Sequence, residues 1–539
     1  MCRARNRADD LFRISGGIAT SSGVEYVASR IIYRHCEATQ IQGVVLLCLL
    51  MSHSLTPQLF ESRLLYHFGF DPTSGQQRLF HVFTRFVLSE KSRCGLIVKG
   101  YAGTGKTTSV RAMVSALEEA GFGIMLLAPT GRAAKVLSTY TGRPAKTIHK
   151  QIYIRRSDRT GRTWFELRES EVERTVFFVD EASMIGSERM DMIGDELASG
   201  DLLEDLMAHV FSRAGCRVVL IGDSAQLPPV GSDKSPALDL EFVRDRYNLH
   251  IAEVELQEVI RQKEGSAILE NATSIRGEIG AGTSTYPSIV LSPQSKEMEL
   301  VEGDIQPYVE EAMGKYGVDG LIILTRSNKR ANLFNQQMRV RVLGHEEEIN
   351  SGDRMMVVRN NYFWLEGTSS QIAGFIANGD IIEVTRVRSF VDRGEFRFCR
   401  AVILLADYPD VPEMEVILWC DTISGESANM SYAKMKELYQ VISADYEDIE
   451  NHGKRRKAIR EDPFYNALQV KFAYAITVHK AQGGQWPCVF VDQGYLTEEM
   501  LGPEYNRWLY TAFTRAQEKL LLVGFDEKMI TVKENPESQ

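Results

Sequence analysis

Residues 96–117 read LIVKGYAGTGKTTSVRAMVSAL, an apolar run followed by a glycine-rich loop and then a run with helical spacing. From Gly100 to Thr107 the loop fits the pattern G-x-x-x-x-G-K-[ST] without mismatch. Its glycines allow backbone N–H groups to close around an anion without Cβ clashes. A helix that begins directly after the loop points its positive N-terminus at the same anion. The stretch therefore predicts a buried strand, a phosphate-binding loop and a helix of an α/β core.

The side chains of this segment suit a nucleoside triphosphate, with ATP as the expected nucleotide. Lys106 is predicted to reach the β- and γ-phosphates as part of the catalytic set, and Thr107 to ligate Mg²⁺. A chance glycine turn is the alternative, and the strand before the loop and the helix after it argue against that alternative. The residues expected to hold the nucleotide here are Gly100, Gly103, Thr104, Gly105, Lys106, Thr107 and Thr108.

Two further apolar runs end in polar residues, as expected at the carboxyl edge of a parallel sheet. Residues 175–184, TVFFVDEASM, place Asp180 and Glu181 there. Asp180 is predicted to hold Mg²⁺ and Glu181 to orient or deprotonate the attacking water, with a carboxylate that caps a helix as the plainer alternative. Residues 217–231, RVVLIGDSAQLPPVG, place Gln226 where its amide is predicted to contact the γ-phosphate. A polar turn is the alternative for Gln226.

Length and composition favour a multidomain protein of a reducing compartment. The chain has 539 residues, too many for one hydrophobic core, and a formal net charge of −10. Its eight cysteines are scattered without a C-x-x-C pair, which argues against a zinc site and predicts a cytoplasmic location. The apolar run over residues 44–51 is shorter than the roughly 20 residues that span a bilayer. Residues 1–55 read as an N-terminal extension, and Met51 is an alternative start.

In their order and in their amino-acid sequences, these loops resemble the motifs of the superfamily 1B DNA helicases of the RecD/Dda-like group, over residues 72–525. The resemblance implies two RecA-like α/β domains with ATP in the cleft between them. Three further apolar runs, at 321–325, 489–492 and 520–524, independently suit the buried parallel strands of a second core. The other segments that carry the resemblance are PTSGQQ (72–77), LAPTGRAAKVL (127–137), TIHK (147–150), LQEVIRQ (256–262), AYAITVHKAQGGQW (473–486) and YTAFTRAQ (510–517).

The resemblance also implies roles outside the phosphate loop. Gln76 is expected to read the adenine, and Gln485 stands where many relatives carry a glutamate that touches the nucleotide ribose. Arg261 and Arg515 are expected to reach the γ-phosphate from the second domain, because a guanidinium stabilises the charge on the transferring phosphoryl group. A surface salt bridge is the alternative for each arginine. The residues expected to contact single-stranded DNA are Pro129, Thr130, Arg132, Lys135, Thr147, His149, Lys150, Thr477, His479 and Lys480.

A basic stretch surrounds several of these DNA-binding candidates. Between residues 130 and 162 there are nine Lys or Arg residues and one acid, which suits a phosphate backbone. A solvated face balanced by acids elsewhere is the alternative. Residues 151–170 predict two short strands around a Ser-Asp-Arg-Thr-Gly turn. The resemblance places the strand-separating pin of the family in this hairpin, and core packing is an equal alternative for Trp164 and Phe165.

An insertion interrupts the second core. Alternating strands at 381–387, 395–405 and 415–422 predict a small barrel, and residues 431–461 predict a helical run. The resemblance implies an SH3-like insertion that clamps DNA or braces the pin. The expected α/β domains are 56–148 with 172–255 (first RecA-like domain), 149–171 (hairpin pin), 256–375 with 465–539 (second RecA-like domain) and 376–464 (SH3-like and helical insertion).

The function implied by the resemblance is that of an ATP-dependent DNA helicase that moves 5′ to 3′ on single strands and unwinds duplexes. The expected ligands are single-stranded DNA and duplex junctions. Single-strand-binding, replication or recombination proteins are further candidate partners. The motor is expected to be a monomer. Two alternatives share every motif: a single-strand translocase that displaces proteins, and a RecD-type motor subunit of a recombination nuclease complex. A non-catalytic binder is disfavoured because Lys106, Thr107, Asp180 and Glu181 are all present.

Overall fold

The computed structural model describes residues 55–157, 163–187, 201–259, 266–283, 285–292, 294–365, 375–406, 408, 410–425, 427 and 430–533. Apart from Leu55, the extension expected over residues 1–55 lies outside the described residues. The chain divides into two units, Met1–Ser62 and Arg63–Gln539. Helix α4 (Pro57–Phe68) straddles their boundary, and every later element belongs to the second unit.

A six-stranded sheet forms the core of the first half of the chain. Its strand order is β3-β2-β6-β7-β1-β8, and each neighbouring pair runs parallel. All residues of β6, TVFFV, are buried, because a strand that is covered on both faces needs a continuous apolar run. The strands are β1 (Cys94–Gly100), β2 (Gly123–Ala128), β3 (Ala145–Thr147), β6 (Thr175–Val179), β7 (Arg217–Gly222) and β8 (His250–Leu256).

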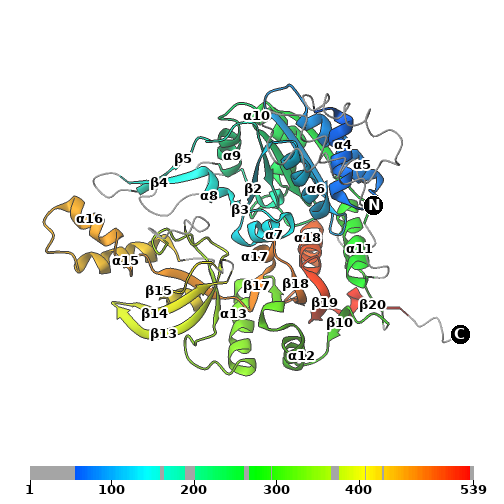
Figure 1. The fold of residues 1–539 in the computed structure, drawn as a ribbon. Coiled ribbons are helices and arrows are strands. Elements are labelled where there is room, and N and C mark those ends of the chain that lie inside the picture. Colours follow the sequence, from blue (N-terminus) through cyan, green and yellow to red (C-terminus); the bar gives the residue numbers. More distant parts are fainter. Residues whose placement is uncertain are drawn as a thin grey trace, which may run out of the picture. The chain divides into compact units, whose positions relative to one another are not determined.

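Helices cover this first sheet (Figure 1). Helix α6 (Lys106–Glu119) follows β1 through the phosphate loop, so the predicted strand, loop and helix are confirmed. Helix α5 (Ser74–Val87) begins with a capping box in which Thr73 and Gln76 satisfy each other's backbone N–H groups. The others are α7 (Gly131–Thr141), α8 (Ile148–Ile152), α9 (Leu202–Val210) and α10 (Leu240–Tyr247), with 3₁₀ turns η1 (Ala182–Met184) and η2 (Pro236–Leu238).

A second parallel sheet confirms the expected second α/β core. Its order is β10-β19-β18-β11-β17, and the three apolar runs expected to form parallel strands are its neighbouring strands β11, β18 and β19. The strands are β10 (Met298–Val301), β11 (Leu321–Thr325), β17 (Ala475–Thr477), β18 (Trp486–Asp492) and β19 (Ala516–Val523). The helices are α11 (Ala267–Ala281), α12 (Gln306–Tyr316), α13 (Asn328–Gln337), η4 (Met338–Val342), α17 (Val478–Ala481) and α18 (Pro503–Phe513). Strands β9 (Ile289–Leu291) and β20 (Ile530–Val532) pair separately, and η3 (Val318–Gly320), η5 (Glu498–Met500) and η6 (Glu527–Met529) are short turns.

The expected barrel is present and is larger than the interval assigned to it. It closes through β12 (Arg354–Val357), β13 (Ile381–Arg393), β14 (Phe396–Leu405), β15 (Met414–Trp419) and β16 (Leu468–Phe472). The first and last of these strands, β12 and β16, lie outside residues 376–464. The barrel therefore includes two segments that the sequence analysis assigned to the second core. The physical reason is closure: β12 and β16 pair with each other and cover both edges of the other three strands.

The helical run expected over residues 431–461 is two helices, α15 (Tyr432–Ala444) and α16 (His452–Arg460). Asn451 starts the second helix, because its side chain accepts a hydrogen bond from the Lys454 N–H at 3.0 Å. A short helix, α14 (Asp421–Ser424), follows β15. No helix among the described residues is long and apolar enough to cross a bilayer.

The predicted hairpin is confirmed as the antiparallel pair β4 (Tyr153–Ser157) and β5 (Thr163–Leu167). Figure 1 shows it extending from the first sheet as a two-stranded ribbon. The ring centroid of Phe165 lies 4.8 Å from that of Tyr362, which in turn lies 4.4 Å from that of Phe375. Phe165 therefore packs against aromatic residues that flank the barrel. The turn itself, residues 158–162, lies outside the described residues.

Candidate functional site

The phosphate loop has the backbone shape that its glycines predict. Gly103 and Gly105 both have φ of 77°, a left-handed conformation that other residues adopt only with strain. At Gly100 a Cβ would lie 2.9 Å from the Lys106 Cγ and from the Thr104 Oγ1. The loop therefore needs glycine for backbone conformation at two positions and for space at a third.

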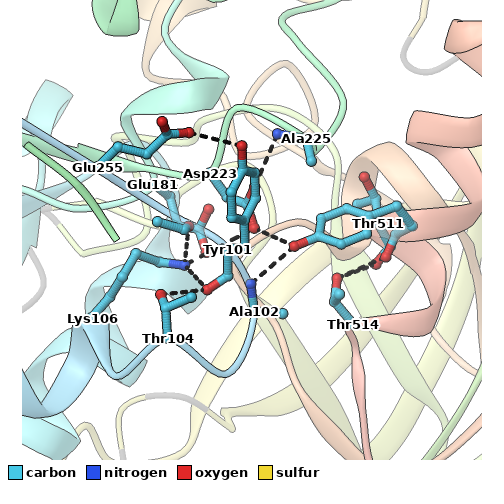
Figure 2. A network of polar contacts seen from close by, with 12 residues as sticks. Tyr101, Ala102, Thr104, Lys106, Glu181, Asp223, Ala225, Glu255, Thr511 and Thr514 are labelled. Atoms are coloured by element: carbon cyan, nitrogen blue, oxygen red, sulfur yellow. Dashed lines mark hydrogen bonds and ion pairs between the residues drawn. The ribbon is translucent and has the colours of Figure 1, made fainter. Parts of the chain in front are cut away.

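The ammonium group of Lys106 lies inside the loop. It donates hydrogen bonds to the carbonyl oxygens of Gly100 and Tyr101, and its Nζ lies 4.0 Å from Oδ2 of Asp223 (Figure 2). Carbonyl oxygens and a carboxylate thus stabilise the positive charge of Lys106. The same charge is available to a phosphate that enters the loop.

The two predicted acidic residues lie side by side at the carboxyl end of β6. Asp180 accepts hydrogen bonds from the Tyr140 hydroxyl at 2.7 Å and from the Glu181 N–H at 2.9 Å. Burial raises the pKa of Asp180 and raises that of Glu181 to about 7, while Arg515 acts to lower the latter. Glu181 also has φ of 52°, a left-handed conformation that costs energy for a non-glycine residue. A buried glutamate with a pKa near neutrality suits proton transfer from water.

The residues present fit Mg²⁺ only as an ion that arrives with a nucleotide. Among the described residues, no cluster of three His, Cys, Asp or Glu side chains has the arrangement of a metal site. Thr107 and Asp180 line the same pocket and offer one hydroxyl and one carboxylate. Mg²⁺ typically takes one or two such protein oxygens and completes its shell with phosphates and water.

The cleft that contains these groups takes residues from both sheets. Its volume is about 470 Å³. Gln485 and Arg515 reach it from the second sheet, and Gln226 reaches it from the loop after β7. Of the predicted nucleotide-binding residues, Gly103, Thr104, Gly105, Lys106, Thr107, Thr108 and Gln485 line the cleft, and Gly100 contributes its carbonyl to Lys106.

Arg515 lies in the cleft but is tied to its own side of it. Its guanidinium donates to the carbonyl oxygens of Thr511 at 3.0 Å and Gly484 at 3.2 Å, and to the Thr514 hydroxyl. The side chain is buried. The second expected arginine, Arg261, lies outside the described residues, so the structure carries no information on it.

The side-chain amides of two predicted site residues, Gln226 and Gln76, differ in their hydrogen-bond partners. Gln226 is buried, and its Oε1 has no hydrogen-bond partner within the described part of the chain. Gln76, expected to read the adenine, is fully buried and does not line the cleft. Its Oε1 accepts from the Thr73 N–H at 3.0 Å, and its Nε2 donates to the Thr104 carbonyl at 3.2 Å. In this arrangement Gln76 supports the phosphate loop from behind.

The residues predicted to contact DNA lie on or just before three helices, α7, α8 and α17, and several already have protein partners. Thr130 and Thr147 are N-caps, accepting from the Ala133 N–H and the Lys150 N–H at 3.2 Å each. The Arg132 guanidinium lies 3.8 Å from the ring centroid of Trp486, which belongs to the second sheet. Pro129 lies just before α7, and Thr477 just before α17.

Lysines of the same group meet residues next to the barrel. Lys135 Nζ donates to the Ala406 carbonyl at 3.3 Å, and Lys150 Nζ donates to the Tyr408 hydroxyl at 3.3 Å. The Lys150 ammonium also lies 4.9 Å from the ring centroid of Phe375. Burial lowers the pKa of Lys150. These contacts place the barrel against the basic segment that the sequence assigned to DNA.

The two histidines of the group are neutral at pH 7. Burial lowers the pKa of His149 to about 4 and also lowers the pKa of His479. For Lys480 burial, assisted by Lys471, lowers the pKa to about 8. Neutral imidazoles donate or accept hydrogen bonds but carry no charge to a phosphate. The positive charge of this face therefore comes from its lysines and from Arg132.

Sequence reasoning assigned no role to several residues in or beside the cleft. Tyr140 lines it and donates to Asp180, and Tyr510 beside it binds Asp223 and the phosphate loop. Ile268, Leu269 and others of α11 form an apolar wall. Tyr510 begins a segment that carries the resemblance, but a tyrosine on a helix face ordinarily reads as core.

Comparisons with known proteins find similarity to helicases along most of the chain. A family model for an AAA domain matches residues 81–287, and one for the UvrD-like helicase C-terminal domain matches residues 472–523. The ATP-dependent DNA helicase dda of Enterobacteria phage T4 is 24% identical over 478 residues, which cover 82% of this chain and 99% of that protein. The ATP-dependent RecD2 DNA helicase of Deinococcus radiodurans is 25% identical over 441 residues, 80% of this chain.

The chain spans 47% of the length of that RecD2 helicase and 26% of a probable conjugal transfer protein TraA of Sinorhizobium fredii. Among solved structures, a Bacteroides Pif1 helicase in complex with ADP-AlF3 and ssDNA is 16% identical, with a TM-score of 0.43, covering 86% of this chain and 95% of that one. The family models fall in order, one across the phosphate loop and one across the cleft arginine, and the likeness to Dda runs along almost all of that protein. These similarities support a superfamily 1B helicase.

Proposed function

We propose that this chain is an ATP- and Mg²⁺-dependent DNA helicase that moves 5′ to 3′ on single-stranded DNA and separates duplexes. One observation carries the proposal: a single cleft brings Lys106 and Glu181 of the first sheet together with Arg515 of the second. A phosphoryl group held between them would have a cation on each side and a base beside it. The likeness to Dda and RecD2, both DNA helicases by name, supports DNA as the strand.

In the proposed reaction the loop N–H groups and Lys106 bind the β- and γ-phosphates. Thr107 and Asp180 would hold Mg²⁺, which would neutralise phosphate charge. Glu181 orients the attacking water and accepts its proton. Gln226 contacts the γ-phosphate through its amide N–H groups, which donate to the phosphate oxygens. Arg515 leaves the carbonyl oxygens of Thr511 and Gly484 and stabilises the charge on the transferring group.

Hydrolysis would be linked to movement because the reacting groups come from two sheets. Closing the cleft completes the site, and hydrolysis removes the phosphate that joins the two sides. The segments that carry Arg132, Lys150 and Lys480 would alternate in their grip on the strand. The hairpin β4–β5, buttressed by Phe165 on Tyr362, is proposed as the pin, and the barrel as the insertion that braces it.

A test uses one duplex with three different tails: 5′ DNA, 3′ DNA and 5′ RNA. ATP hydrolysis and strand separation are followed together, with Lys106→Ala as the inactive control. Unwinding from the 5′ DNA tail alone is the expected result. Hydrolysis stimulated by a strand without separation would instead favour a translocase or a subunit that needs partners, and no stimulation by any tail would contradict the proposal.

A further inference from the structure

Helix α18 meets the phosphate loop through one hydroxyl group. Tyr510, which is 1% exposed, accepts a hydrogen bond from the Ala102 N–H at 2.9 Å. The same hydroxyl donates to Oδ2 of Asp223 at 2.8 Å. Figure 2 shows the contact at Ala102 beside the Lys106–Asp223 pair. A side chain of helix α18 thus joins the phosphate loop and the residue that follows β7.

The hydroxyl also affects which group Lys106 can bind. Asp223 uses its Oδ1 for the Ala225 N–H and its Oδ2 for Tyr510, and that Oδ2 lies 4.0 Å from the Lys106 Nζ. Burial and Asp223 raise the pKa of Tyr510 well above its ordinary value, so the hydroxyl stays a donor. Because the Tyr510 hydroxyl already donates to Asp223, the carboxylate interacts less strongly with the Lys106 ammonium. Lys106 is then available to bind a phosphate.

The same helix leads directly to Arg515. Two residues after the end of α18, Arg515 lies in the cleft, and its guanidinium is held by the Thr511 carbonyl. Thr511 in turn accepts from the Leu227 N–H at 3.0 Å, and Arg507 donates to the Ser224 carbonyl. The helix is therefore attached along its length to the loop after β7, and Tyr510 is its attachment to the phosphate loop.

We propose that Tyr510 is a positioning residue for ATP hydrolysis, which sets the register of the helix that carries Arg515 against the phosphate loop and keeps Asp223 from holding Lys106. The inference rests on the proposed function, since it assigns a role within the same site. Its hydroxyl acts through Ala102, Asp223 and Arg515 and needs no contact with the substrate.

The test is Tyr510→Phe, which removes the hydroxyl and keeps the ring. The matched control is Tyr505→Phe on the same helix: Tyr505 is 2% exposed, and its hydroxyl accepts from Gln493 at 3.2 Å, within the second sheet and its helices. ATP hydrolysis is measured with and without a single-stranded DNA oligonucleotide, alongside the KM for ATP and the thermal midpoint. Tyr510→Phe is expected to lower kcat about tenfold, to leave the KM within about twofold, and to match Tyr505→Phe in thermal midpoint.

A double variant separates positioning from stability. If Tyr510 acts by placing Arg515, adding Tyr510→Phe to Arg515→Ala lowers kcat little further, because the two losses are not additive. A kcat for Tyr510→Phe equal to that of Tyr505→Phe would overturn the inference, and fully additive losses would overturn the part of it that acts through Arg515. A wild-type protein that hydrolyses ATP without strand stimulation would contradict the helicase proposal while the comparison of the two tyrosines still decides this one. A wild-type protein without any hydrolysis would overturn both.

Discussion

The cleft around Lys106 contrasts with helices α7, α8 and α17, which carry the predicted DNA contacts, in how polar groups are used. In the cleft, Gln226 keeps a buried oxygen without a partner among the described residues, and Lys106 is held by carbonyl oxygens. On the three helices, Lys135 and Lys150 already bind residues next to the barrel. The proposed nucleotide site therefore keeps a polar group without a protein partner, whereas two of the predicted DNA contacts already have one.

The difference teaches that the two ligands make different demands on the fold. A nucleotide is small, and most of its predicted contacts lie in one loop of eight residues. A nucleic-acid strand is long, and its predicted contacts are spread over three helices. In the proposed complex Lys135 and Lys150 would exchange a protein partner for a phosphate, which would lower the net gain from each contact.

The largest expected effect is at the centre of the cleft. Lys106→Ala should reduce strand-stimulated ATP hydrolysis by ~10³-fold, because the charge on the phosphates loses its nearest cation. The thermal midpoint should change little, since Lys106 is held by carbonyl oxygens that water can reach through the cleft. Lys99→Ala, which removes a lysine paired with Glu253 at 2.7 Å outside the cleft lining, is the control. Equal activity of Lys106→Ala and Lys99→Ala would remove the cleft from the mechanism.

Arg515→Ala comes next and tests the contribution of the second sheet. Turnover should fall by ~10²-fold with ATP binding retained, because the guanidinium is expected to act on charge that develops during phosphoryl transfer. Binding is measured with a fluorescent nucleotide and turnover by phosphate release. Arg507→Ala, a neighbouring arginine that donates to the Ser224 carbonyl and does not line the cleft, separates loss of the reacting cation from loss of contact between the sheets. Normal turnover in Arg515→Ala would show that another group faces the γ-phosphate.

A smaller effect distinguishes neighbours on helix α8. Lys150→Ala should weaken single-stranded DNA binding several-fold and reduce the slope of log affinity against log salt by ~0.7, the loss of one phosphate contact. His149→Gln should leave that slope unchanged, because the pKa of His149 is lowered to about 4 and the ring is neutral at pH 7. Fluorescence anisotropy across a salt series measures both. A reduced slope for His149→Gln alone would reverse the assignment of charge.

The smallest expected effect depends on pH. In the free protein the pKa of Lys480 is lowered to about 8, so it loses charge as the pH rises through 8. A bound phosphate favours the charged form and raises this pKa, so DNA binding should take up a proton and weaken as the pH increases from 7 to 9. Calorimetry at pH 8.5 in buffers of different ionisation enthalpy measures the uptake. Lys480→Arg, permanently charged, should abolish it, and an unchanged uptake in that variant would place the titration elsewhere.

Much of the nucleotide site could be predicted because its signals are local. The glycine spacing predicts the loop, and an apolar run ending in Asp180 and Glu181 predicts a strand whose carboxyl end faces the ligand. Gln76 shows the limit of such reasoning. Its motif was identified from the resemblance, but whether its amide faces a base or the Thr104 carbonyl depends on how α5 packs behind the loop.

The barrel shows the same limit at the level of domains. Alternation in the sequence predicts three of its strands, but β12 and β16 are short and buried and read equally well as part of a parallel core. Strand pairing decides whether β12 and β16 belong to the barrel or to a parallel core. The two strands pair with each other although they lie far apart in the chain.

By itself, the sequence determined the phosphate loop, the acidic pair after β6 and two α/β cores, because each depends on spacing within one short segment. Only the tertiary structure decided that Tyr510 joins α18 to the loop, that Thr130 and Thr147 cap helices, and that Lys150 meets Tyr408. A buried hydroxyl or ammonium group must find a partner, and which partner it finds depends on the three-dimensional arrangement of distant segments.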